Sequence, residues 1–188
     1  MQIKKCFHNR PCALHRCHTS AANHFCQTQS ICQPMHVRSY RPGDEIALWQ
    51  VFHDAVHQLA ANHYSQEQLD AWAPQRPDWT QWRQRIQALQ PFVAVCDNDQ
   101  AMAYADLQAN GYIDHFFVAP QHARQGVGRR LLAHIEQTER QHGLHELSAD
   151  VSLNAQAFFA HFGFELQRRQ TPVIRGIALK NARMRKTL

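Results

Sequence analysis

The sequence predicts one α/β domain whose mixed, mostly antiparallel sheet carries helices on both faces. Short apolar segments of strand length alternate with longer segments in which apolar residues recur every three to four positions. In the second half, three strands joined by tight turns precede a helix and another strand, an order that requires antiparallel pairs and a crossover connection. A chain of 188 residues has room for one such domain and a modest extension.

The first half of the domain is predicted to contain one strand and three helices. Their expected positions are a strand at 36–40 and helices at 44–59, 65–72 and 78–89. The strand alternates in polarity and ends at an Arg-Pro-Gly-Asp turn signal, in which Asp44 can cap the first helix. Ser65 and Gln68 match a capping box, which sets the start of the second helix.

The second half begins with strands and then alternates helix with strand. We expect strands at 92–96, 101–107 and 112–118, a helix from Gly126 to Gly143, a strand near 147–151, a helix at 155–162, and a closing antiparallel pair at 165–171 and 174–179. The segments Asp97–Asp99 and Asn110–Gly111 have the composition of hairpin turns. The first three of these strands should therefore form a meander.

The distribution of charge and apolar residues argues against nucleic-acid and membrane partners. The formal net charge is +5, but residues 1–34 hold four Lys or Arg and no Asp or Glu. The remaining residues carry 16 basic and 15 acidic side chains, so the predicted domain is nearly neutral. No apolar run reaches the roughly 20 residues that cross a bilayer, and no apolar segment of a secretory signal follows the early lysines. We expect a cytoplasmic protein.

The segment 1–34 differs in composition from the rest of the chain. It holds five of the six cysteines, interleaved with four histidines, yet it has no Cys-x-x-Cys pair and no apolar periodicity. We expect a disordered leader, or a start placed upstream of a true initiator at Met35, followed by the domain at 35–188, and no metal. A zinc site is the alternative, and stoichiometric zinc in the purified full-length chain would favour it.

The most informative stretch runs from Phe117 to Leu132. Gly126-Val127-Gly128 lies between an apolar strand and a helix start, where glycines let backbone N–H groups approach an anion and the helix dipole adds roughly half a positive charge. Arg124 and Arg129 add further charge, so a pyrophosphate is a natural ligand. The stretch fits neither the Walker loop, which needs Gly-Lys-Ser/Thr, nor the dinucleotide fingerprint, which needs a third glycine.

Together, these residues resemble the coenzyme-A signature of the GNAT superfamily of N-acetyltransferases, commonly Gln/Arg-x-x-Gly-x-Gly/Ala after a strand ending in Val-x-Pro. The segment 152–164 resembles the closing helix and Gly-Phe motif of that family, and the resemblance covers roughly 36–180. Around His63–Ser65 and Ala71–Ala73 the chain also resembles the bacterial YafP-type branch. The resemblance implies the GNAT fold and transfer of an acetyl group from acetyl-coenzyme A to a primary amine, by direct attack in a ternary complex.

The resemblance also implies where the coenzyme binds. Its pantetheine would lie in a V-shaped opening between the fourth and fifth strands, whose splayed edges expose unpaired N–H and C=O groups. The residues implied to bind it are Phe117, Val118, Arg124, Gln125, Gly126, Val127, Gly128, Arg129, Asn154 and Phe158. Two positions depart from the family pattern: Ala123 replaces a polar loop residue, and Phe159 replaces a tyrosine that often protonates the leaving thiolate.

The fourth strand carries the candidate catalytic residues, Asp114 and Tyr112. Acetyl transfer requires a neutral amine, so a base must remove a proton from the acceptor. Relatives often use a carboxylate on this strand, which implies Asp114; a solvated or salt-bridged carboxylate is the alternative. Tyr112 is the candidate acid in place of Phe159, and we expect His115 to be a surface or core histidine.

The acceptor side of the cleft is predicted to include Tyr64 and Trp72, because the early helices of this fold usually shape that pocket. Plain core packing is the alternative for Trp72. The acceptor is either a small-molecule amine or a protein amine, and a homodimer is left open. Because Phe159 has no proton to donate, a catalytically silent acyl-coenzyme-A-binding module is a second reading.

Overall fold

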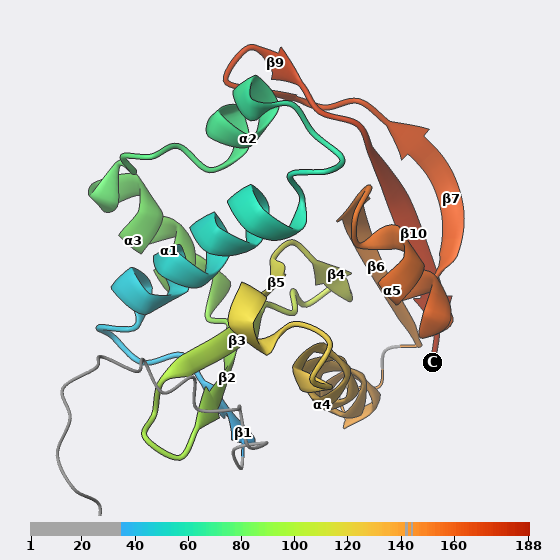
Figure 1. Ribbon diagram of the computed structural model, residues 1–188. Coiled ribbons are helices and arrows are strands. Elements are labelled where there is room, and N and C mark those ends of the chain that lie inside the picture. The colour runs from blue at the N-terminus through green and yellow to red at the C-terminus, as the bar shows by residue number, and fades with distance from the viewer. Residues whose placement is uncertain (1–34, 142, 144) are drawn as a thin grey trace, which may run out of the picture. The chain divides into compact units, whose positions relative to one another are not determined.

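The computed structural model describes residues 35–141, 143 and 145–188. The Cys- and His-containing segment 1–34, for which we expected a leader or a misplaced start, lies outside the described residues. Figure 1 shows the arrangement of the elements.

The order of elements in the described residues follows the predicted alternation (Figure 1). In chain order they are β1 (Met35–Ser39), α1 (Glu45–Asp54), a π-helical turn (Ala55–Leu59), α2 (Gln66–Trp72), α3 (Trp79–Leu89), β2 (Phe92–Cys96), β3 (Ala101–Ala105), β4 (Tyr112–Ile113), β5 (Phe116–Val118), a 3-10 turn (Pro120–His122), α4 (Val127–Gln141), β6 (Glu146–Ser152), α5 (Gln156–His161), β7 (Glu165–Gln170), β8 (Val173–Ile174), β9 (Ile177–Ala178) and β10 (Asn181–Thr187).

Two predicted helix starts carry capping bonds, at Ser65 and Asp78, whereas the expected cap of α1 by Asp44 was wrong. The Asp44 carboxylate instead accepts the N–H of Arg41 and two bonds from the Arg38 guanidinium. The Ser65 side chain accepts the backbone N–H of Gln68 while the Gln68 side chain accepts that of Ser65, which completes the capping box. Asp78 caps α3 by accepting the N–H groups of Thr80 and Gln81, both at 3.0 Å. These bonds act within four residues, which is why the sequence alone located them.

The strands form two main sheets and a small hairpin. One sheet has the order β1-β2-β3-β5 and is antiparallel throughout. The other has the order β4-β6-β10-β7, in which β4 and β6 are parallel and the other pairs antiparallel. The expected mixed, mostly antiparallel architecture is therefore confirmed, although it is divided between two sheets.

The division occurs inside a segment that we predicted to be one strand, 112–118, and that prediction was wrong. The chain leaves β4 at Ile113 and resumes as β5 at Phe116, so β4 pairs with β6 while β5 pairs with β3. The Asp106 carboxylate accepts the N–H groups of Asp114 at 3.0 Å and His115 at 2.6 Å. A side chain that takes these two donors competes with the strand ladder, which explains the break.

The predicted pairing of 165–171 with 174–179 was also wrong. β7 pairs with β10, a strand that we did not predict, while β8 and β9 form a separate hairpin. In β10 only Ala182 and Met184 are buried, between polar neighbours, so the apolar alternation of this strand is weak in the sequence. The turn between β8 and β9 places Arg175 and Gly176 at φ of 48° and 81°, in the left-handed region.

Helices cover both faces of the first sheet, as predicted. Val93 and Val95 of β2 belong to an apolar cluster with residues of α1 and α3, whereas Ala94 and Cys96 belong to a second cluster with α4 and α5. The alternation of one strand between two clusters follows from its two-residue period. In the described part of the chain, no helix is both long and apolar enough to cross a membrane.

Candidate active site

The predicted anion-binding loop joins β5 to α4. Arg124 and Gly126 have φ of 61° and 82°, and a Cβ on Gly126 would meet nothing within 4 Å. Gly126 is therefore required for its backbone conformation rather than for space. Arg130 donates its N–H to the carbonyl of Gly126 at 3.1 Å, so this is the first helical bond. The preceding N–H groups at the start of α4 have no partner inside the helix.

Gly128 brings three of the predicted coenzyme residues together. A Cβ at this position would lie 3.3 Å from the ring of Phe158 and 3.5 Å from the side chain of Val118. The first turn of α4 thus approaches α5 and the end of β5 closely, and only glycine leaves that space open. Of the other predicted residues, Gln125 donates to the carbonyl of Gln121 at 2.7 Å within the loop.

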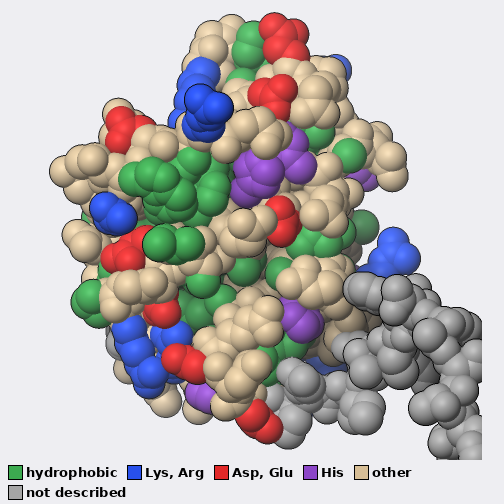
Figure 2. Space-filling model, turned by 60° about the vertical axis from the view of Figure 1, so that its left-hand side comes forward, with side chains coloured by type: hydrophobic (Ala, Val, Ile, Leu, Met, Phe, Trp, Pro, Cys, Tyr) green, Lys and Arg blue, Asp and Glu red, His purple; other side chains and the backbone are tan. Residues whose placement is uncertain are grey.

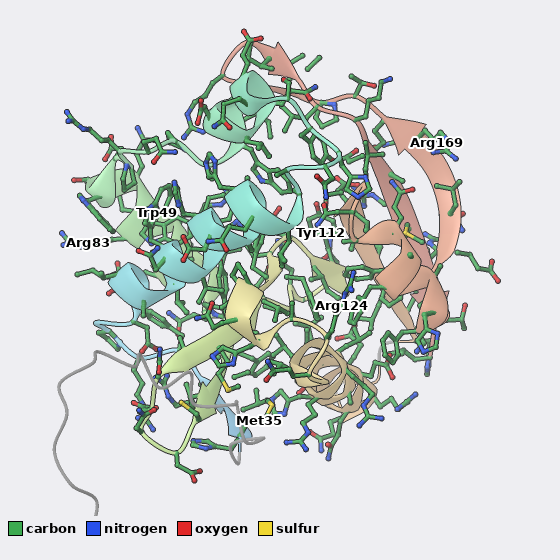
Figure 3. The ribbon with its side chains drawn as sticks, in the orientation of Figure 1. Met35, Trp49, Arg83, Tyr112, Arg124 and Arg169 are labelled. Atoms are coloured by element: carbon green, nitrogen blue, oxygen red, sulfur yellow. The ribbon has the colours of Figure 1, made fainter. Side chains whose placement is uncertain are left out.

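Asn154 lies in the turn between β6 and α5, where its Oδ1 accepts the hydroxyl of Ser152 at 2.9 Å. Figure 3 shows Arg124 in the loop before α4 and Tyr112 on β4. Thus the predicted coenzyme residues come from β5, the loop with the start of α4, the β6–α5 turn and α5 itself.

A cavity of about 650 Å³ lies where β5 diverges from β6. Phe116 and Phe117 of β5 line it on one side and residues 149–152 of β6 on the other, with side chains of α1, α2 and α3 above them. Both predicted acceptor residues are in its wall. The aromatic rings that line the cavity are those of Trp49, Phe52, Tyr64, Trp72, Trp82, Tyr112, Phe116, Phe117 and Phe159.

Two hydrogen bonds of its hydroxyl group, one donated and one accepted, hold Tyr64 in this wall of the cavity. Its hydroxyl donates to the carbonyl of Lys180 at 2.7 Å and accepts the N–H of Leu153 at 2.9 Å. Burial raises the pKa of Tyr64. Trp72 packs edge-on against Tyr64, with ring centroids 5.6 Å apart, so it both contacts the core and lines the cavity.

Asp114 lies in the break between β4 and β5, rather than on a continuous strand face as expected. Its carboxylate lines the cavity, one quarter exposed, and accepts a short hydrogen bond from the guanidinium of Arg85 on α3. The neighbouring His115 is buried and bonds Tyr104 at 2.9 Å and Arg85 at 3.1 Å. Burial, followed by the charge of Arg85, lowers the pKa of His115 to about 3.

Tyr112 reaches the cavity from β4. Its hydroxyl donates to Asp150 on β6 at 3.2 Å, and the Arg183 guanidinium lies 4.8 Å from its ring centroid. Arg183 also holds Asp150 through two bonds of 2.7 and 3.1 Å. Burial and the charge of Asp150 raise the pKa of Tyr112 well above its ordinary value. The phenol therefore keeps its proton at neutral pH and its hydroxyl is a donor there, but the raised pKa also makes it a weaker acid than an ordinary tyrosine.

Comparison with known families identifies the domain. Residues 60–188, more than half of the chain, match the family described as Acetyltransferase (GNAT) domain. The chain belongs to the GNAT family. The resemblance of the 117–132 and 152–164 motifs to this family is thereby confirmed.

Individual relatives support the GNAT assignment. The chain is similar to the uncharacterized N-acetyltransferase YafP of Escherichia coli K12, with 34% identity over 149 residues, which cover 79% of this chain and 93% of YafP. It is also similar to a solved GCN5-related N-acetyltransferase from Rhodopseudomonas palustris, with TM-score 0.79 and 29% identity, covering 85% of this chain and 99% of that one. The PaiA N-acetyltransferase of Thermoplasma acidophilum, solved in complex with coenzyme A, shares the fold at TM-score 0.63 and 17% identity, covering 82% and 99%.

Phe159 departs from the GNAT pattern in an apolar setting. Its ring is buried and packs against Phe116, Phe158 and Phe164 at centroid distances of 5.4, 5.5 and 4.9 Å. It also lines the cavity, so a hydroxyl on this ring would be close to the opening between β5 and β6. In this GNAT protein any protein-borne acid must therefore come from another side chain.

Of the polar cavity residues that sequence reasoning missed, two contact the predicted catalytic side chains. Arg85 is one helical turn from the buried Trp82, a spacing that indicates a shared face but does not identify the carboxylate of Asp114 as its partner. Asp150 alternates with the buried Ala149 and Val151, which indicated only that it points away from the core. Both meet their partners through contacts across 29 or more residues.

Among the described residues, no group of three His, Cys, Asp or Glu side chains is placed to hold a metal ion. Cys96 is buried, and its thiol donates to the Asn98 side chain at 2.7 Å. The cysteines and histidines of the N-terminal segment lie outside this part of the chain.

Proposed function

We propose that this GNAT domain is an N-acetyltransferase that moves the acetyl group of acetyl-coenzyme A to a primary amine, by direct attack in a ternary complex. The observation that carries the proposal is the divergence of β5 from β6, with an aromatic cavity in the opening and the glycine loop of α4 at the end of β5. Transfer between two bound molecules requires such an arrangement, because both must reach one carbonyl carbon.

The residues present fit the coenzyme. β5 pairs with β3 along one edge and leaves β6, so Phe117 and Val118 can offer main-chain groups to the pantetheine amides. The pyrophosphate would lie at the N-terminus of α4, where the helix dipole and Arg124 favour negative charge. Because Gly128 has no Cβ, the first turn of α4 packs closely against Val118 and Phe158, beside the proposed pantetheine site. The solved Thermoplasma relative, which holds coenzyme A, has the same fold.

The proposed chemistry uses two cavity side chains. Asp114, directly or through water, removes a proton from the acceptor ammonium, and the neutral nitrogen attacks the thioester carbonyl. The new C–N bond gives a tetrahedral intermediate, whose collapse breaks the C–S bond. The leaving thiolate takes a proton from Tyr112, because Phe159 has none to give, and the Tyr112 phenolate regains a proton, through water, from the cationic nitrogen, which leaves a neutral amide. The N–H of Val118 would polarise the carbonyl oxygen.

The acceptor would bind on the side of the cavity that α2 and the β8–β9 hairpin line, with Tyr64 and Trp72 in its wall. Both a small-molecule amine and a protein amine are compatible with this opening. A cytoplasmic location, without a nucleic-acid partner, fits the use of acetyl-coenzyme A. Figure 2 shows one face on which basic and acidic side chains are interspersed rather than gathered by sign, consistent with a nearly neutral domain.

A catalytically silent coenzyme-binding module is the second candidate, and Phe159 in place of the usual tyrosine favours it. One experiment separates the two. Acetyl-coenzyme A is titrated calorimetrically into the full chain, and thiol release is then measured across a panel of amines. Binding with thiol release on one amine class supports the enzyme; binding without release on any amine supports the module; no binding overturns both.

A further inference from the structure

Arg85 bridges two residues that follow each other in the break between β4 and β5. Its Nη2 donates to Oδ2 of Asp114, and its Nε donates to Nε2 of His115 at 3.1 Å. The guanidinium is planar and its donors point in fixed directions, so holding one donor fixes the direction of the other. The side chain is 52% exposed, which leaves it free to swing unless these bonds hold it.

We infer that Arg85 is a positioning residue for Asp114, and that His115, anchored by Tyr104, sets the direction of the Arg85 guanidinium. This inference rests on the proposed function, in which Asp114 takes the proton of the acceptor. It assigns a role to three residues that the motifs of the sequence do not mark.

The bond from Arg85 fixes the tautomer of His115. Arginine Nε always carries its proton, so Nε2 of His115 must accept and its proton must be on Nδ1. The Nδ1–H then donates to the hydroxyl oxygen of Tyr104 at 2.9 Å. Because Tyr104 is fully buried and His115 nearly so, this end of the chain of bonds has little freedom.

The backbone beneath Asp114 is held as firmly as its side chain. Oδ1 of Asp106 accepts the N–H groups of both Asp114 and His115, and the Asp106 N–H donates to the His115 carbonyl at 3.1 Å. The bond from Arg85 engages Oδ2 of Asp114, so Oδ1 is the oxygen left to accept a proton from the acceptor. These bonds fix the orientation of the Asp114 carboxylate. Orientation matters because small misplacements of a catalytic group lower the rate by up to about 100-fold.

Arg85→Ala tests the role, with Arg83→Ala as the matched control. Arg83 is an exposed arginine on the same helix, and Figure 3 shows it at the outer edge of the domain, away from Tyr112. On the amine accepted by the wild-type chain, we expect Arg85→Ala to lower kcat about 10- to 100-fold with little change in the KM for acetyl-coenzyme A. Millimolar guanidinium, far below denaturing concentrations, should restore part of the lost kcat, and Arg83→Ala should match the wild type.

Two further variants test whether Arg85 acts through Asp114 and whether Tyr104 acts through Arg85. In an Asp114→Asn background, Arg85→Ala should cause no additional loss, because residues that act as a unit are not additive. Tyr104→Phe should lower kcat by a smaller factor and add nothing to Arg85→Ala.

An active wild type with an unaffected Arg85→Ala variant, a loss that guanidinium does not rescue, or a full additional loss in the Asp114→Asn background would each overturn the positioning role and leave the proposed function intact. A wild-type chain that transfers acetyl to no amine would overturn the proposed function, and this inference with it.

Discussion

Gly128 shows how much one missing methyl group can decide. A Cβ there would lie 3.3 Å from the Phe158 ring and 3.5 Å from the Val118 side chain, so the Phe158 ring and α4 would have to move slightly apart. Gly126, two residues earlier, has free space but a left-handed backbone. The two glycines of one motif are thus required for different reasons: Gly126 for its backbone conformation, and Gly128 for close packing against Val118 and Phe158.

Gly128→Val is expected to weaken acetyl-coenzyme A binding about 5- to 150-fold, because overpacking against Val118 and Phe158 costs about 1–3 kcal/mol and displaces groups beside the proposed pantetheine site. Calorimetric titration measures the change. Ala133→Val, an exposed position on the same helix, is the control for the branched side chain. Unchanged affinity in Gly128→Val would place the coenzyme elsewhere.

His115 gives the domain a predictable acid sensitivity. Its pKa falls from an ordinary 6.5 to about 3 on folding, so between these values the unfolded chain binds a proton that the folded chain does not. The resulting stability is complete above 6.5 and is lost as pH falls toward 3, by up to about 1.4 kcal/mol per pH unit. Burial raises the pKa of Asp106 from 3.8 to about 6, which acts in the opposite sense over that interval.

We therefore expect the free energy of unfolding of His115→Gln to depend less steeply on pH than that of the wild type between about pH 6.5 and 4. Urea denaturation at several pH values measures both slopes. His36→Gln, at an exposed position on β1, should keep the wild-type slope. Parallel curves for His115→Gln and the wild type would contradict the assignment of the acid sensitivity to His115.

Two elements far apart in sequence build one wall of the cavity. Gln68 on α2 donates to the carbonyl of Ala178 on β9 at 2.8 Å, and Arg175, in the turn between β8 and β9, donates to the carbonyl of Ala71 at the end of α2 at 2.5 Å. A basic side chain at the last carbonyls of a helix is favourable. The hairpin is thus joined to α2 at both its tip and its base, which fixes the position of this wall of the cavity.

Arg175→Gln is expected to raise the KM for the amine several-fold and to leave the affinity for acetyl-coenzyme A unchanged, because it removes the guanidinium that joins the hairpin tip to α2. Gln keeps the same unfavourable left-handed position at 175, so the backbone strain does not differ. Steady-state kinetics with each substrate varied in turn separates the two effects. Arg169→Gln, an exposed position on β7 labelled in Figure 3, is the control. An equal change in both substrates would point to general unfolding.

At the scale of the whole molecule, the described residues contain everything that the proposed site uses. Both apolar clusters, the cavity, the glycine loop and the bonds around Asp114 are built from residues 35–188. The family match begins at residue 60 and also lies within this range. The domain at 35–188 is accordingly proposed as the unit that folds and acts.

A chain that begins at Met35 is therefore expected to have the thermal unfolding midpoint, acetyl-coenzyme A affinity and kcat of the full chain. Differential scanning calorimetry and thiol-release assays on both chains check this. Metal analysis of the full chain tests the alternative for the N-terminal Cys/His segment, since stoichiometric zinc, or a loss of kcat in the shorter chain, would give that segment a role.

Interactions within a few residues were open to prediction from the sequence. The capping box at Ser65, the start of α3 after Asp78 and the glycine loop before α4 depend on neighbours along the chain, and each was found where the sequence placed it.

Only the tertiary structure decided the rest. Asp106 breaks the predicted strand from eight residues away, and the end of the chain displaces 174–179 as the partner of β7. Asp114 gained its arginine partner from a helix 29 residues earlier. These outcomes depend on which polar groups and strand edges come into contact after the chain has packed. A local sequence pattern does not predict such long-range contacts. The sequence by itself determined the family and placed the glycine loop before α4, whereas packing determined the sheet division, the cavity and the direction of the proposed base.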